Sequence, residues 1–277
     1  MNIDELIKAA LVEDIGDGDH SSLATIPQTA MGKAHLLIKE EGIIAGVDIA
    51  EKVFHFVDPD IKFEKYIDNG SAVAVGDIVF QVSGKSTSLL TAERLALNYM
   101  QRMSGIATKT NYYVKLLQGL KTKVLDTRKT TPLMRKLEKQ SVKLGGGENH
   151  RFGLYDMIMI KDNHIDFAGG IANAIDATHR YLKEKNKNLK IEIEVRNFDE
   201  LNQVLKHGNI DRIMLDNFTP ADIRKALQLI DNKYETEASG GITEESIRAY
   251  AETGVDYISV GALTHHIRSL DMSLKAV

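Results

Sequence analysis

The 277-residue chain contains no cysteine. This absence excludes disulfides, thiol nucleophiles, iron–sulfur clusters and cysteine-ligated zinc. An excess of positive charge is also missing, because 35 Lys and Arg residues against 39 Asp and Glu residues give a net charge of −4. Nucleic acids and anionic membranes are usually bound by basic surfaces, so we expect neither as a partner. Any chemistry on anions must come from a local cluster of cations.

Long hydrophobic runs are absent as well. No segment reaches the roughly 18 apolar residues that span a bilayer, and residues 1–16 lack the apolar core of a signal peptide. Two nucleotide-binding motifs are missing: no G-x-G-x-x-G follows a strand-like run, and "LGGGENH" has the glycines of a P-loop without its lysine. The sequence therefore predicts a cytoplasmic protein that does not use a dinucleotide-binding doubly wound sheet.

The rhythm of the chain changes near residue 121. Before it, short strand-like runs fill residues 31–84, and a long helical region covers residues 86–120. We expect two helices in that region, meeting near Ser104 and Gly105, because glycine costs about 1 kcal/mol inside a helix. After residue 121, strands alternate with amphipathic helices, which is the pattern of βαβ units around a parallel sheet. The prediction is an α+β domain followed by an α/β barrel.

Almost every strand of the predicted barrel ends in a polar group or a glycine. In an α/β barrel the carboxyl ends of the strands meet on one rim, and this rim holds the active site. The strand ends, in chain order, are Asp126 with Arg128 and Lys129, then Lys161, Glu194, Asp216, Ser239 and Gly261. This succession is the strongest functional signal in the sequence.

The candidate site groups are of three kinds. Guanidinium groups bind carboxylates in bidentate fashion and lysines add point charge, so the cations predict an anion site. Carboxylates suit Mg²⁺ or sugar hydroxyls, and glycine turns with exposed amides suit a phosphate. The cations are Arg128, Lys129, His150, Arg151 and Lys161; the carboxylates are Glu194 and Asp216; the turns are Ser239, Gly240, Gly241 and Val260, Gly261, Ala262.

Each signal taken alone has a plainer interpretation. Arg128 and Lys129 are equally consistent with solvated charges after a strand, and a lone histidine such as His150 is more often structural. Alternation directs Glu192 and Glu194 to the same side of one strand. A barrel interior tolerates such groups only where they are paired or functional, so we expect at least one of the two to be functional.

At these residues the chain resembles the quinolinate phosphoribosyltransferase family, also called carboxylating nicotinate-nucleotide pyrophosphorylases, nearly end to end. The matching stretches, in order and with family-like spacing, are "EDIGDGD", "RLALNYMQRMSGIAT", "DTRKTTP", "GGGENHRFGLYDMIMIKDNH", "IEIEV", "LDNF", "EASGGI" and "GVDYISVGAL". One departure lies in "TTPLMRKLEKQSV", where the family pattern has a glycine after Pro132 and an aromatic residue near Gln140. Here Leu133 follows the proline, which we expect to change loop shape without altering the charged groups.

The resemblance implies an α/β fold in which an N-terminal open α/β domain (an α+β sandwich) precedes an incomplete seven-stranded α/β barrel, like that of type II phosphoribosyltransferases. On this basis residues 1–110 form the first domain, residues 111–265 form the barrel, and residues 266–277 return to the first domain. The resemblance also implies a homodimer in which Arg102 reaches the neighbouring subunit's site, with a higher oligomer left open.

The implied reaction joins quinolinate to phosphoribosyl pyrophosphate and releases pyrophosphate and carbon dioxide, giving nicotinate mononucleotide for NAD synthesis. The resemblance assigns Mg²⁺ and the ribose hydroxyls to Glu194 and Asp216, and the 5′-phosphate to the two glycine turns. It assigns the quinolinate carboxylates to Arg102, Arg128, His150, Arg151 and Lys161, with Lys129 between the two substrates. The candidate catalytic residues are Lys129, Lys161, Glu194 and Asp216.

Three alternatives stay open. The first is a paralogue of the same fold with another acceptor, such as the proteins associated with molybdenum uptake. The second is a Schiff-base lyase with Lys161 as the amine. The third is a regulator that binds a phosphorylated ligand, although simple phosphate binding has no use for Glu194 and Asp216.

Overall fold

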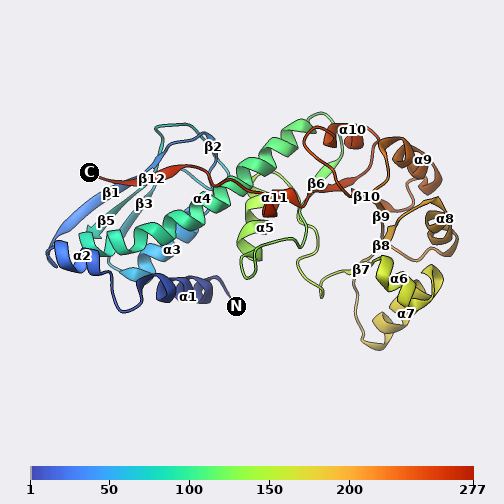
Figure 1. Cartoon of the computed structure of the whole chain (residues 1–277), viewed down its shortest axis with the longest axis horizontal. Coiled ribbons are helices and arrows are strands. Elements are labelled where there is room, and N and C mark those ends of the chain that lie inside the picture. Colours follow the sequence, from blue (N-terminus) through green and yellow to red (C-terminus); the bar gives the residue numbers. More distant parts are fainter. Residues whose placement is uncertain (1) are drawn as a thin grey trace. The chain divides into compact units, whose positions relative to one another are not determined.

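The computed structural model describes residues 2–277, which form two compact units (Figure 1). The second unit contains residues 112–129 and 147–261, and the remaining segments belong to the first. Residues 130–146, which the sequence analysis placed within the 111–265 barrel domain, therefore lie with the first unit. The reason is packing: Leu137 from this segment is fully buried in the hydrophobic core of the first unit.

The first unit is built on a four-stranded antiparallel sheet in the order β12-β1-β5-β3. Its elements are α1 (Ile3–Ile15), α2 (His20–Thr25), β1 (Met31–Ile38), β2 (Gly42–Ile43), α3 (Val47–Val57), β3 (Lys62–Lys65), β4 (Ala72–Val73), β5 (Ile78–Lys85), α4 (Ser86–Leu116, its last residues in the second unit), α5 (Arg135–Leu144), α11 (Ala262–His265) and β12 (Met272–Ala276). Strand β1 buries alternate residues against the core, as a half-covered sheet requires. The C-terminal strand β12 pairs with β1, with Leu274 opposite Leu36.

Helix α4 is continuous from Ser86 to Leu116, so the prediction of two helices meeting near Ser104 and Gly105 was wrong. The glycine has a packing role instead. A Cβ at Gly105 would overlap the carbonyl oxygen of Arg268, so the absence of a side chain lets the two backbones approach. This close packing offsets the low helix propensity of glycine.

The second unit contains a six-stranded parallel sheet in the order β6-β11-β10-β9-β8-β7, with helices outside the strands (Figure 1). Its elements are β6 (Lys123–Leu125), β7 (Ile158–Ile160), α6 (Asp162–Ala168), α7 (Ile171–Glu184), β8 (Ile191–Val195), α8 (Phe198–His207), β9 (Arg212–Asp216), α9 (Pro220–Ile230), β10 (Glu235–Ser239), α10 (Ile247–Ala251) and β11 (Tyr257–Ser259). The fold is the predicted incomplete α/β barrel. A seventh strand position is occupied by a single parallel bridge between Leu125 and Glu148, which is too short to form a strand.

Local sequence signals place the barrel helices. Thr219 caps α9 by accepting the backbone N–H of Asp222, with Pro220 at the first helical position. Asn197 caps α8 in the same way by accepting from Glu200. Every residue of β8 is buried, which is typical of a parallel strand covered on both faces.

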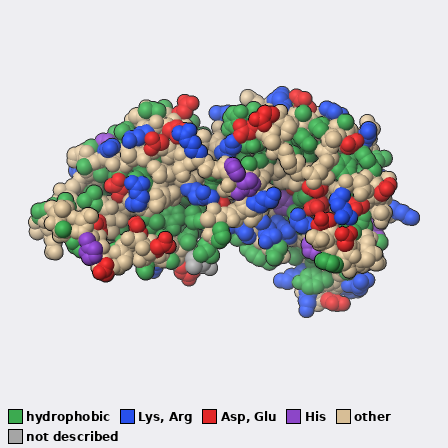
Figure 2. All heavy atoms as spheres, viewed as in Figure 1, with side chains coloured by type: hydrophobic (Ala, Val, Ile, Leu, Met, Phe, Trp, Pro, Cys, Tyr) green, Lys and Arg blue, Asp and Glu red, His purple; other side chains and the backbone are tan. Residues whose placement is uncertain are grey.

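The charged surface is mixed. Figure 2 shows Lys and Arg side chains interspersed with Asp and Glu on the visible face, in agreement with the nearly balanced composition. Among the described residues, no helix is long and apolar enough to cross a membrane.

The departure from the family pattern at Leu133 has a conformational consequence. Leu133 lies in the left-handed region, with φ of 65°, and its side chain is 67% exposed. Left-handed backbone costs a residue with a Cβ about 1–2 kcal/mol, whereas glycine adopts it readily. Leucine therefore occupies a position whose backbone conformation suits glycine.

We expect Leu133→Gly to raise the free energy of unfolding by up to about 1 kcal/mol, because it removes this strain and little packing is lost. Leu133→Ala is the matched control, since it removes the same exposed side chain but keeps the Cβ. Urea unfolding of the three proteins measures the difference. Equal stabilities of the Gly and Ala variants would show that the backbone at this position stores no strain.

Candidate functional site

The parallel register brings the predicted strand ends to one edge of the barrel sheet. Asp216 at the end of β9 pairs with Ser239 at the end of β10. Ser259 at the end of β11 pairs with Leu125 of β6, and the next amide, Val260 N–H, donates to the Leu125 carbonyl at 2.9 Å. The carboxyl ends of these strands are where an α/β barrel holds its site. We call this edge the rim.

Two arginines of the rim lie close enough to repel each other. Burial lowers the pKa of the Arg151 guanidinium, and the positive charge of Arg128 lowers it further. Arg151 Nη1 donates to the carbonyl of Met157 at 3.3 Å. Arg128 and Lys129 are exposed at the loop that follows β6. The negative charges of Glu192 and Asp156 offset part of this repulsion, and an anionic ligand between the two arginines would offset more of it.

Lys161 and Glu194 form an ion pair on the rim. Lys161 Nζ lies 3.1 Å from Glu194 Oε2, with 46% of the lysine side chain exposed and 10% of the glutamate side chain. Lys161 follows β7 and Glu194 is in the neighbouring strand β8. The pair therefore brings a cation and a carboxylate side by side at the ends of adjacent strands.

The turn after β10 presents unused amides. Gly240 and Gly241 have φ of 99° and 59°, and neither N–H donates to any residue that the structure describes. A Cβ at Gly240 would overlap the side chain of Asn217, whose Nδ2 donates to Asp216 at 2.7 Å. Two free amides in a glycine turn can donate hydrogen bonds to phosphate oxygens.

The second glycine turn offers less to a phosphate. The Val260 amide is already used, because it donates to Leu125 in the sheet. Gly261 follows it, and Ala262 begins α11 in the first unit. The predicted phosphate contacts of Val260, Gly261 and Ala262 stay a prediction, while Gly240 and Gly241 have the geometry for it.

His150 lies inside the barrel and is only 7% exposed. Its Nε2 is 3.0 Å from Glu192 Oε2 and 3.3 Å from Glu237 Oε2. Its Nδ1 lies 2.6 Å from the backbone nitrogen of Arg151, whose N–H it accepts. Its own backbone N–H donates to Asp126 Oδ1 at 2.9 Å. Both ring nitrogens are thus directed at protein groups.

The two glutamates influence the protonation of the ring. Burial lowers the pKa of His150, but the hydrogen bonds and charges of Glu192 and Glu237 outweigh it and raise the pKa to about 9. The carboxylates thus favour a ring that is protonated on both nitrogens. The hydrogen bond from the Arg151 N–H favours the neutral ring instead, because a protonated Nδ1 cannot accept it. Nε2 carries a proton in both states, so the contact with the carboxylates is common to them.

Arg102 is held within the first unit by a buried carboxylate. Its Nε and Nη2 donate to Glu138 Oε1 at 2.9 and 2.6 Å, and Nη2 also donates to Thr131 Oγ1 at 2.8 Å. Glu138 is fully buried on α5, whereas 31% of the Arg102 side chain is exposed. The remaining group, Nη1, has no hydrogen-bond partner among the described residues.

Sequence reasoning missed two of these carboxylates. Glu237 alternates with Glu235 in "ETEAS", so the argument applied to Glu192 and Glu194 would have found it. Glu138 had no such signal, because it lies in a polar helix whose buried face depends on packing in the first unit. Of Glu192 and Glu194, the structure brings the first to His150 and the second to Lys161.

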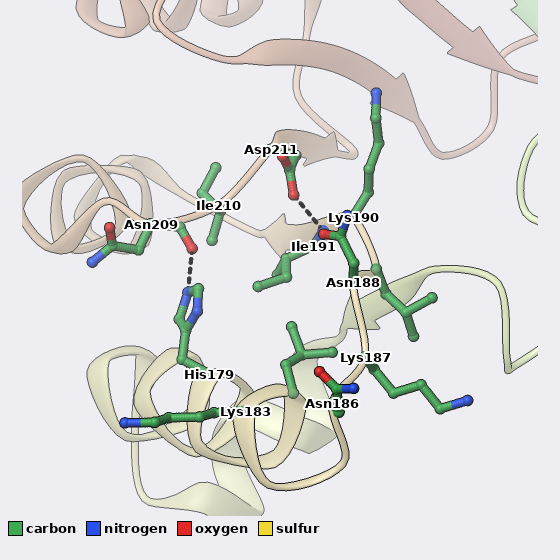
Figure 3. A pocket seen from close by; sticks show the side chains of 12 residues that line it. His179, Lys183, Asn186, Lys187, Asn188, Lys190, Ile191, Asn209, Ile210 and Asp211 are labelled. Atoms are coloured by element: carbon green, nitrogen blue, oxygen red, sulfur yellow. Dashed lines mark hydrogen bonds between the residues drawn. The ribbon is translucent and has the colours of Figure 1, made fainter.

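A pocket elsewhere in the barrel does not coincide with the rim. It lies at the amino ends of β8 and β9 and is lined by Lys183, Lys187 and Lys190, among others. Figure 3 shows His179 beside the carbonyl of Asn209, at 2.7 Å. Because barrel sites form at the carboxyl ends of strands, we do not assign the chemistry to this pocket.

A parallel α/β barrel whose rim combines clustered cations, two carboxylates and free glycine amides defines a protein that binds phosphorylated or polycarboxylate small molecules. Comparison with known families gives a more specific answer. Residues 19–104 match the family model described as quinolinate phosphoribosyl transferase, N-terminal domain, and residues 106–275 match the corresponding C-terminal domain. The chain belongs to the quinolinate phosphoribosyl transferase family.

Individual relatives are similar over nearly the whole chain. Quinolinate phosphoribosyltransferase (decarboxylating) 1b of Nicotiana tabacum is 44% identical over 98% of this chain and 81% of its own length. Chloroplastic nicotinate-nucleotide pyrophosphorylase (carboxylating) of Arabidopsis thaliana has the same identity and coverage. The solved nicotinate-nucleotide pyrophosphorylase of Francisella tularensis is 41% identical with a TM-score of 0.94, covering 99% of this chain and 96% of that one.

We expect Glu138→Ala to lower the free energy of unfolding by about 3 kcal/mol, because it removes the buried partner of Arg102. The exposed Lys52–Asp4 pair, at 2.9 Å, supplies the control: Lys52→Ala should change stability by less than about 0.5 kcal/mol. Chemical unfolding measures both. Similar small losses for the two variants would contradict a structural role for the Arg102–Glu138 pair.

Proposed function

We propose that this protein is a quinolinate phosphoribosyltransferase that acts in NAD biosynthesis. It transfers the phosphoribosyl group of phosphoribosyl pyrophosphate to quinolinate and forms nicotinate mononucleotide, pyrophosphate and carbon dioxide. Family membership supports this reaction. The observation that carries the proposal is the rim itself, where repelling arginines, a Lys–Glu pair and free glycine amides lie at the ends of neighbouring strands.

The cations bind the two adjacent carboxylates of quinolinate. Arg128 and Arg151 repel each other in the protein alone, so a dianion between them relieves an existing cost. Lys161 adds point charge. Lys129 is exposed on the same loop as Arg128, and its positive charge lies between quinolinate and the pyrophosphate. The sequence assigned His150 to direct contact with these carboxylates; we instead propose that it acts through Arg151, since its ring nitrogens are directed at protein groups.

Glu194 and Asp216 bind the ribose hydroxyls and Mg²⁺. Carboxylate oxygens are the donors that Mg²⁺ prefers, and the ion commonly uses one or two of them while substrate phosphates complete its shell. Glu194 and Asp216 meet that requirement, as they belong to adjacent strands of the rim. Bound Mg²⁺ would neutralise the charge of the departing pyrophosphate. The 5′-phosphate accepts hydrogen bonds from the backbone amides of Gly240 and Gly241, beside Ser239.

The chemistry needs no nucleophilic side chain. The pyridine nitrogen attacks the anomeric carbon of the ribose, and the bond to pyrophosphate breaks with its electron pair leaving on pyrophosphate. Glu194 and Asp216 stabilise the positive charge that develops on the ribose. The ring is then quaternised and stabilises the electron pair left on ring carbon 2 when the 2-carboxylate departs as carbon dioxide, and this carbon then takes a proton from solvent. Catalysis is therefore mainly positioning and electrostatics.

The active form is a homodimer, or a higher oligomer built from it, in which Arg102 completes the partner's site. The arrangement of Arg102 supports this role, because Glu138 fixes two of its nitrogens and leaves Nη1 available. The protein acts in the cytoplasm. This compartment is a prediction from the sequence, whereas the Arabidopsis relative is named as a chloroplastic protein.

The alternatives have less support. A Schiff-base lysine requires an apolar pocket or a cationic neighbour, whereas Lys161 is exposed and lies against Glu194. A paralogue with another acceptor would share the phosphoribosyl site but would not need the arginine pair that suits two adjacent carboxylates.

Purified protein with phosphoribosyl pyrophosphate and Mg²⁺ should convert quinolinate to nicotinate mononucleotide, and should leave nicotinate, which lacks the 2-carboxylate, unreacted. Liquid chromatography of the nucleotide measures both reactions. Turnover of nicotinate at a similar rate would contradict the two-carboxylate site. Saturable binding of phosphoribosyl pyrophosphate without any turnover would favour the paralogue.

Mixing two inactive variants should restore activity. In a heterodimer of Arg102→Ala and Lys161→Ala chains, the barrel with intact Lys161 receives Arg102 from its partner, so one of the two sites is complete. We expect such heterodimers, isolated with two different tags, to have about half the activity of the wild type. Lack of any restoration would show that Arg102 acts within its own subunit. The two homodimers serve as controls and should be inactive.

A further inference from the structure

Two fully buried glutamates lie below the rim and have no role in the reaction proposed above. Glu192 of β8 pairs in register with Arg212, the first residue of β9, and Glu237 of β10 pairs with Met214. Asp216, the rim residue of β9, lies beyond both positions. The side chains of Glu192 and Glu237 are 0% exposed. They are therefore too deep to contact a ligand on the rim.

The Glu192 carboxylate faces His150. Neither of its oxygens accepts a well-aligned hydrogen bond from a described residue, and His150 Nε2 lies 3.0 Å from Oε2. Glu237 has His150 at 3.3 Å and also Arg212 Nη1 at 3.3 Å. Burying a carboxylate without adequate partners costs several kcal/mol. The cost of burying Glu192 and Glu237 is consistent with a role for both carboxylates in holding the His150 ring.

His150 transmits its position to Arg151. The ring accepts the Arg151 backbone N–H at 2.6 Å, and the His150 backbone N–H is bound by the buried carboxylate of Asp126. The peptides before and after His150 are thus each held by one hydrogen bond, the first through the His150 N–H and the second through the Arg151 N–H. Arg151 needs such support, because its guanidinium is partly buried and is repelled by Arg128. Without it, the guanidinium would move away from the second arginine.

We propose that Glu192 and Glu237 are positioning residues that, through His150, hold Arg151 in place to bind the dicarboxylate substrate. This proposal rests on the proposed function and adds a role for residues that do not touch the substrate. The contact geometry disfavours a metal ion between the three side chains, because Arg212 adds positive charge beside Glu237 and the Arg151 amide occupies the other ring nitrogen.

The test compares Glu192→Gln and Glu237→Gln with Glu235→Gln. Glu235 is the matched control: it is in the same strand as Glu237 and also pairs with Arg212, at 3.0 Å, but it does not contact His150. We expect each of the first two variants to raise the KM for quinolinate about tenfold, because small displacements of a binding group are costly. The KM for phosphoribosyl pyrophosphate should change less than about twofold, and Glu235→Gln should resemble the wild type.

A double variant separates positioning from general loss of structure. If the glutamates act through His150, then adding Glu192→Gln to His150→Gln should raise the KM for quinolinate little further. Independent effects that multiply in the double variant would overturn the proposal, as would equal increases of both KM values. Thermal unfolding identifies variants that fail to fold. If one of Glu192→Gln and Glu237→Gln fails to fold, the KM values of the other provide the test.

Binding of benzene-1,2-dicarboxylate, measured by calorimetry, keeps this test independent of turnover. If the wild type binds the dicarboxylate but forms no nucleotide, the proposed function fails, while the glutamate variants should still bind the dicarboxylate about tenfold more weakly. Unchanged binding in both variants would overturn the positioning role. One equivalent of zinc in the purified protein, removable by a chelator, would show a metal site instead.

Discussion

Repulsion between clustered cations is the constraint on which the rest of the site depends. Arg128 and Arg151 are close enough for one charge to lower the pKa of the other. The structure limits this cost by placing a carboxylate of low exposure behind individual cations. Arg102 has Glu138, and Lys161 has Glu194. These pairs hold Arg102 and Lys161, and in the proposed site Arg128 and Arg151 attract the dianion.

This arrangement explains how a chain with a net charge of −4 binds highly anionic substrates. The carboxylates compensate cations at or below the rim, so the attraction for an anion is local. In the proposed reaction the same distribution serves two needs, because the cations hold carboxylates while Glu194 and Asp216 face the positive charge that develops on the ribose. In this proposal the reaction depends on fixed positive and negative side chains and needs no nucleophilic side chain.

The barrel and its rim could be predicted from the sequence because strand ends in a parallel sheet follow directly from chain order. Polar residues such as Lys161, Glu194 and Asp216 mark those ends, and no long-range information is needed to align them. The continuity of α4 through Gly105 could not be predicted, since it depends on the distant Arg268 backbone. The role of Glu138 likewise depends on tertiary packing, and residues 130–146 join the first unit for the same reason.

The order of chemical steps gives the most direct test of the central claim. Quinolinate labelled in its 2-carboxylate is incubated with the enzyme and Mg²⁺, first without and then with phosphoribosyl pyrophosphate, in a single turnover. The account predicts no labelled carbon dioxide in the first case, and in the second carbon dioxide and pyrophosphate in equal amounts. Release of carbon dioxide without the phosphoribosyl donor, or a nucleotide that keeps both carboxylates, would contradict it.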